Sequence, residues 1–130
     1  MDLKLAKKVV NGIKWSMQRN QRSNRPVKEI SITAQDILDI YKHQNEKCYW
    51  TKIGLDSEFN KIPYHPLAIS ADRKDNKQPY SKENVVLTMR ILNLGRREFS
   101  ENEFPNVVSY LMEKLAIEYI RKKDESSFME

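Results

Sequence analysis

Hydrophobic residues near the start of the chain repeat with the period of an α-helix. The repeat has i, i+4 spacing and consists of Leu5, Val9, Ile13 and Met17. Because lysines occupy the other side of this stripe, the pattern predicts an amphipathic helix. The run from Gln18 to Glu29 is polar, and its Pro26 disfavours helix at the preceding residue. We therefore expect this run to break the helix and to form a basic linker or arm.

The segment from Thr33 onward predicts a second helix. The Thr33 hydroxyl can cap the first turn, and Asp36 stands at the third helical position, as a capping box requires. We expect this helix to end between Asn45 and Lys47, where the apolar repeat stops.

Two short apolar runs follow and predict a pair of strands. They cover residues 67–70 and 84–89, and a long polar loop separates them. The pattern favours a helix again from about Thr88, and a last helix is expected over residues 105–122 with a frayed polar tail behind it. The apolar stripe of that last helix consists of Val108, Leu111, Leu115, Tyr119 and Ile120.

This order of elements indicates an α+β fold, in which helices flank a central strand–loop–strand–helix. A length of 130 residues fits a single domain with one modest core. We divide it into a basic helical arm (residues 1–30), a central region with its lead-in helix (31–104) and the C-terminal helix (105–122).

Composition narrows the class of protein. No apolar run approaches the roughly 18 residues of a membrane-spanning helix, and the basic N-terminus lacks the pattern of a signal peptide. We therefore expect an intracellular protein without a membrane partner, in the host cytoplasm if a phage encodes it. Cys48 is the only cysteine, which excludes an internal disulfide and a multi-cysteine zinc site.

The positive charge is concentrated in two segments. The chain carries a net charge of +5, yet residues 4–28 hold eight basic side chains and no acid, and residues 61–97 hold eight basic against three acidic. Confined positive charge of this kind is typical of a face that binds a polyanion such as DNA. A solvated basic helix is the plainer interpretation of the same pattern.

The central region carries a series of short motifs in a recognisable order. They are a Cys-x-x-Thr turn at Cys48–Thr51, the run SADRKDN at Ser70–Asn76, Tyr80, the pair Asn84-Val85, and Asn93 in the helical segment. In order and spacing, residues 30–105 resemble the HNH endonuclease family, and within it a phage-type branch that has Asp-Arg in place of Asp-His.

The resemblance implies a ββα-metal core with one divalent cation, Mg²⁺ by preference and Mn²⁺ as an alternative. Asp72 would be the first ligand, as a hard oxygen donor directly after an apolar strand, and Asn93 on the helix would be the second. Asn84 would be structural and tie the loop to the strand. In a plainer interpretation, Asp72 and Asp75 are ordinary turn residues.

The general base is the point at which the chain departs from the better-known members of the family. Arg73 stands where those members have a histidine, and a guanidinium stays protonated, so it cannot accept a proton from water. Arg73 is therefore expected to clamp the phosphate. His65 is the alternative base, although about 20 Å of extended chain could separate it from Asp72. A metal-bound hydroxide is another possibility, and no base at all is the last.

The function implied by the resemblance is metal-dependent cutting or nicking of DNA, with duplex DNA as the expected partner and the oligomeric state open. One alternative is an HNH-like module that binds nucleic acid without cleaving it. Another is an interaction or inhibitor protein with basic faces. The cations expected to meet phosphates are Lys14, Arg19, Arg22, Arg25, Lys74, Arg90, Arg96 and Arg97.

Overall fold

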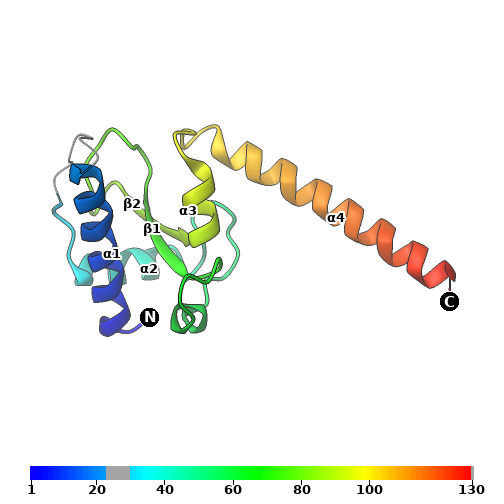
Figure 1. Ribbon diagram of the computed structural model, residues 1–130, viewed down its shortest axis with the longest axis horizontal. Coiled ribbons are helices and arrows are strands. Elements are labelled where there is room, and N and C mark those ends of the chain that lie inside the picture. The colour runs from blue at the N-terminus through cyan, green and yellow to red at the C-terminus, as the bar shows by residue number, and fades with distance from the viewer. Residues whose placement is uncertain (23–29, 130) are drawn as a thin grey trace.

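Four α-helices, one 3₁₀ helix and two strands follow one another in the computed structural model, which describes residues 1–22 and 30–129 but not the side chains of 20–22 and 127–129. In chain order they are α1 (Leu3–Arg22), α2 (Ala34–His43), η1 (Ser57–Lys61), β1 (Ile69–Arg73), β2 (Val85–Met89), α3 (Arg90–Arg96) and α4 (Phe104–Met129). Figure 1 shows α1, α2 and α3 gathered around the two strands, while α4 projects away from them. The protein is thus a mixed α+β structure, as the sequence predicts.

The first helix buries the predicted stripe but is longer than expected. Val9, Ile13 and Met17 are all in the core, and the Asp2 carboxylate accepts the Leu5 N–H at 2.8 Å, which satisfies one of the first-turn donors. The helix continues past Gln18 as far as Arg22. Glutamine and arginine are good helix formers, so the polar run does not end the helix where we expected. Residues 23–29 lie outside the described part of the chain.

The capping box of α2 is confirmed. Thr33 Oγ1 accepts the Asp36 N–H at 3.2 Å, and the Asp36 carboxylate accepts the Thr33 N–H at 3.0 Å. The helix ends at His43, earlier than predicted, because Asn45 and Glu46 have left-handed φ values of 55° and 62°. Such a turn ends the helix, and the N–H groups of the turn still donate to the last carbonyls of the helix.

The strands form an antiparallel pair in which Ile69 lies opposite Met89 and Asp72 lies opposite Val86. The first strand is displaced from the predicted 67–70, because the N–H groups of Leu67 and Ala68 bond back to His65 and only the following residues reach β2. Thr88 and Met89 belong to the ladder, so α3 begins at Arg90 and not at Thr88.

One hydrophobic core joins α1, α2 and the sheet, and α3 contacts both strands. Trp50, from the loop after α2, is buried in this core. Its indole meets the Phe104 ring edge-on, with 5.2 Å between the centroids. This contact attaches the start of α4 to the body of the protein.

The C-terminal helix differs most from the prediction. It spans Phe104–Met129, and Arg121 forms ion pairs with Glu118 and Glu125, which extend the helix through the tail that we expected to fray. Among the described side chains of α4, only Phe104 and Val108 are buried in the core. The rest of the predicted apolar stripe is exposed, so α4 does not flank the core along its length.

A hydrogen bond from Tyr49 to Glu101 ties the turn before α4 to the loop after α2. Burial, together with this bond to a carboxylate, raises the pKa of Tyr49 to about 12, so its hydroxyl remains a donor at neutral pH.

Candidate functional site

The two strands and α3 bring the residues of the motif together. Ser70 and Asp72 point to one face of β1, because side chains two apart share a face. Asn93 and Arg96, three apart on α3, both turn toward that face. The Asn93 amide donates to Ser70 Oγ at 2.8 Å and to the Ala71 carbonyl at 2.9 Å. The helix is therefore fixed across the hairpin by polar contacts.

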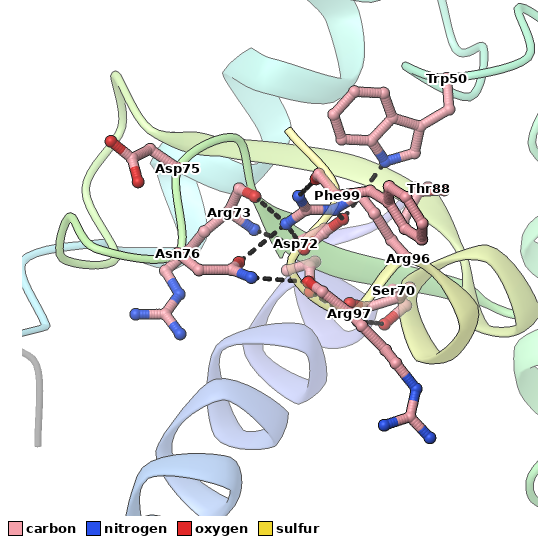
Figure 2. Close-up of polar contacts among 12 residues, drawn as sticks. Trp50, Ser70, Asp72, Arg73, Asp75, Asn76, Thr88, Arg96, Arg97 and Phe99 are labelled. Carbon is pink, nitrogen blue, oxygen red and sulfur yellow. Dashed lines mark hydrogen bonds and ion pairs between the residues drawn. The ribbon is translucent and has the colours of Figure 1, made fainter. Parts of the chain in front are cut away.

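Asp72 is buried, with 6% of the residue exposed, and its carboxylate is surrounded by donors (Figure 2). Arg96 meets both oxygens: Nε lies 2.6 Å from Oδ2, and a terminal nitrogen lies 2.9 Å from Oδ1. The Trp50 indole N–H donates to Oδ2 at 3.2 Å, and the Arg73 backbone N–H donates to Oδ1 at 2.8 Å. Asp72 thus forms the centre of a buried, bidentate ion pair.

Arg96 is even more enclosed, with 2% of the residue exposed. Besides Asp72, its guanidinium donates to the carbonyls of Arg73 and Phe99 and, at 2.8 Å, to Asn76 Oδ1. A side chain held in this way cannot reach a phosphate, so our expectation that Arg96 contacts nucleic acid is corrected. Its position three residues from Asn93 directs it toward the strand, where Asp72 is its partner.

The ion pair between Asp72 and Arg96 determines whether the Asp72 carboxylate could bind a divalent ion. With Arg96 in place, both Asp72 oxygens are directed at donors and the carboxylate does not fit a metal ion. Asn93 differs, because in the part of the chain that is described its Oδ1 accepts no hydrogen bond and the residue lines a groove. No cluster of three or more His, Cys, Asp or Glu suited to a metal occurs among the described residues, although a two-ligand site is smaller than such a cluster.

Asn84 ties the polar loop together. Its Oδ1 accepts the Asp75 N–H at 3.1 Å, and its amide donates to the carbonyls of Asp75 and Pro79 at 3.0 Å and of Gln78 at 3.3 Å. This is the loop-tying geometry that the resemblance implies for Asn84. The contacts hold the loop between β1 and β2 without the help of a ligand.

Arg73 and His65 are held by neighbours of their own. The Arg73 guanidinium lies 4.5 Å from the centre of the Tyr80 ring and donates to the Gln78 carbonyl. His65 stacks on Phe59, and its Nδ1 accepts the Leu67 N–H at 3.0 Å. Because that bond occupies the lone pair of the neutral ring, His65 is not placed to take a proton from water.

A groove of about 770 Å³ opens between α1, the loop of residues 60–68, the edge of β1 and the first turns of α3. Its lining includes the cations Lys8, Arg19 and Arg90 and the aromatic side chains Trp15, Tyr64 and Tyr80. Among the described residues, no aspartate or glutamate lines it. Asn93 contributes from α3, so the groove joins the polar face of the hairpin to the basic face of α1.

The two most exposed of the three aromatic rings that line the groove belong to Tyr64 and Trp15. Tyr64 is 81% exposed, and its φ of 59° is uncommon for a residue with a side chain. The Arg90 guanidinium lies 5.1 Å from the centre of the Tyr64 ring and supports it from one side. Trp15 is 62% exposed on α1. Both rings leave apolar surface in contact with water beside positive charge.

Trp15, Tyr64 and Lys8 are not among the site residues predicted from the sequence. The signal for Trp15 was nevertheless present, because it lies between Ile13 and Met17 and so turns away from the apolar stripe. A large ring on the lysine-rich face of an amphipathic helix has no core to fill. Tyr64 gave no comparable signal, since a tyrosine between two prolines in a loop has no periodic neighbours.

The other predicted nucleic-acid contacts are dispersed. Lys14 is exposed on α1, and Arg97 is exposed after α3, where its carbonyl accepts a bond from Asn76 at 2.6 Å. Lys74 is partly buried in the loop after β1. The Arg22 side chain and the whole of Arg25 lie outside the described residues. Of the predicted cations, Arg19 and Arg90 are the ones that the structure places in the groove.

Comparison with known protein families, with curated proteins and with solved structures finds no match for this chain. Within the described residues, no helix combines the length and the apolar content needed to cross a membrane.

Proposed function

We propose that the protein binds nucleic acid in the groove between α1 and α3. The observation that carries this proposal is the lining of the groove, which combines three cations and three aromatic rings and, among the described residues, contains no acid. Positive side chains follow a phosphate backbone, and exposed rings give unpaired bases a surface on which to stack. A groove for an acidic protein would need the cations but not the exposed rings.

DNA with unpaired bases is the ligand that suits this groove best. The bases of a regular duplex are stacked on each other and cannot cover Trp15 and Tyr64. The resemblance of the central region to HNH proteins makes DNA the preferred nucleic acid. The proposal thus corresponds to the HNH-like binding module and replaces the regular duplex with single-stranded or locally opened DNA.

Charge removal in the groove tests this proposal. We expect Lys8→Gln and Arg90→Gln each to weaken binding of a fluorescent single-stranded oligonucleotide and to reduce the slope of log K against log[salt] by about 0.7. Fluorescence anisotropy over a salt series measures both effects. Lys42→Gln, which removes an exposed charge from α2 outside the groove, is the matched control. Equal slopes for all four proteins would refute the proposed site.

A metal-dependent endonuclease is the second candidate function. It is favoured by the strand–strand–helix order and by Asn93, whose Oδ1 is available beside the groove. Against it stands the Asp72 carboxylate, which does not fit a divalent ion while Arg96 holds both of its oxygens.

A nicking assay decides between the two candidates. With supercoiled plasmid and either Mg²⁺ or Mn²⁺, the binding-module proposal predicts that wild type and Asn93→Ala leave the plasmid equally intact. Nicking that requires both the metal and Asn93 would instead establish the endonuclease. Anisotropy on the same samples shows whether Asn93→Ala still binds DNA, so a lost binding site is not mistaken for lost cleavage.

A further inference from the structure

The exposed part of α4 is an apolar surface that the proposed function leaves unused. Seven large hydrophobic side chains of this helix are between 44% and 67% exposed, namely Tyr110, Leu111, Met112, Leu115, Ile117, Tyr119 and Ile120. At roughly 100 Å² each, half the area of a buried aromatic side chain, they expose about 700 Å². These side chains lie on two opposite faces of the helix. Tyr110, Ile117 and Ile120 share one face with Val107, Glu113 and Lys114, and at the same rate the four apolar side chains of this face expose about 400 Å², within the roughly 300–600 Å² of the largest apolar patch on a typical monomer.

The order of residues in this part of α4 is symmetric. Residues 107–120 read VVSYLMEKLAIEYI. About the point between Glu113 and Lys114, every apolar residue has an apolar counterpart at the same distance on the other side, and Ser109 has the polar Glu118. The two central residues carry opposite charges. A surface that is its own complement when reversed is what a two-fold symmetric interface requires.

We propose that α4 pairs antiparallel with α4 of a second copy of this chain, centred between Glu113 and Lys114. In this arrangement Glu113 of each copy lies near Lys114 of the other, and Tyr110 lies near Ile117, because these four residues share one face of the helix at i, i+3, i+4 and i+7 spacing. Val107 at one end lies near Ile120 at the other. The paired segment of 14 residues is about 21 Å long.

Charge excludes the parallel alternative. A parallel pair would place Glu113 beside Glu113 and Lys114 beside Lys114, and the basic run 121–123 beside its own copy. Like charges at such positions are destabilising. The antiparallel pair instead directs the basic run of each copy toward the segment that precedes the partner's α4, where Glu98, Glu101 and Glu103 lie.

The mass of the full chain in solution tests the pairing. Sedimentation equilibrium should give twice the 15.4 kDa of one chain for wild type and the mass of one chain for the double variant Tyr110→Glu/Ile117→Glu. Ser126→Glu, an exposed position on the same helix beyond the symmetric segment, should remain a dimer. Both substituted residues of the double variant are exposed in the single chain, so unchanged circular dichroism should accompany the loss of mass. A wild-type mass of one chain, or a dimer that survives the double variant, overturns the proposal.

Disulfide cross-linking tests the orientation. Ile120→Cys alone should not cross-link, because an antiparallel pair separates the two copies of position 120 by about 20 Å, far beyond the reach of a disulfide. Val107→Cys/Ile120→Cys should form a covalent dimer under mild oxidation, while the native Cys48 is buried. Cross-linking by the single variant would show a parallel pair and overturn the antiparallel arrangement.

Discussion

Asp72→Asn is expected to lower the free energy of unfolding by about 3–5 kcal/mol, the usual loss when one partner of a buried ion pair is removed. The substitution keeps the volume of the side chain but leaves the Arg96 guanidinium buried without its counter-charge. It also places an amide where the Trp50 N–H now meets a carboxylate. Urea unfolding followed by circular dichroism measures the change.

Asp75→Asn is the matched control for this experiment. Asp75 is exposed in the loop that follows β1, where, among the described residues, its carboxylate accepts only the Lys77 N–H, at 2.9 Å. We expect a change within about 0.5 kcal/mol. If Asp72 were a metal ligand, as the resemblance implies, the fold would not require it. A loss of stability no larger than that of Asp75→Asn would therefore restore the metal-ligand interpretation.

The double variant Asp72→Leu/Arg96→Leu distinguishes the contribution of the ion pair from the cost of one buried charge without a partner. Replacing both charges by apolar side chains removes the unpaired charge, and such replacements are often close to neutral in stability. The double variant should therefore be more stable than Asp72→Asn. If it is less stable, the bonds from Arg96 to the carbonyls of Arg73 and Phe99 contribute more to the fold than the ion pair does.

Trp15→Ala and Tyr64→Ala should each weaken binding of single-stranded DNA by roughly 10- to 100-fold, the effect of losing one stacked base. Both side chains are exposed, so stability should hardly change. Affinity for a regular duplex should fall much less, because its bases do not reach the rings. Anisotropy titrations with an oligonucleotide, alone and annealed to its complement, measure the two affinities.

Tyr119→Ala provides the control for ring removal outside the groove, since Tyr119 is 59% exposed and lies on α4, away from the face proposed for pairing. Trp15→Phe, which keeps an aromatic face, should recover most of the affinity that Trp15→Ala loses. An equal loss for duplex and single strand would mean that the rings contact the backbone and not the bases. No loss at all would move the binding site away from this groove.

Features that depend on neighbours in the sequence could be predicted from it. Thr33 and Asp36 stand three residues apart, so their capping box forms within one helical turn wherever the helix lies. The α1 stripe and the two strands follow from local periodicity in the same way. The bonds of Asn84 also stay within one loop, because its partners lie between five and nine residues away.

Only the tertiary structure decided which partners the polar and aromatic residues of the site meet. Asp72 and Arg96 are 24 residues apart, and the spacing of Arg96 from Asn93 shows which face of α3 it shares but not that this face is closed by a buried carboxylate. Trp15 and Tyr64 line one groove because α1 and a distant loop pack beside the same strand. On α4 the apolar pattern determined a helix by itself. The part of that helix that the core covers depends on where α4 leaves the body of the protein. It does so just after Phe104 and Val108. Periodicity is a property of one segment, whereas burial requires two, and the second segment is placed only by folding.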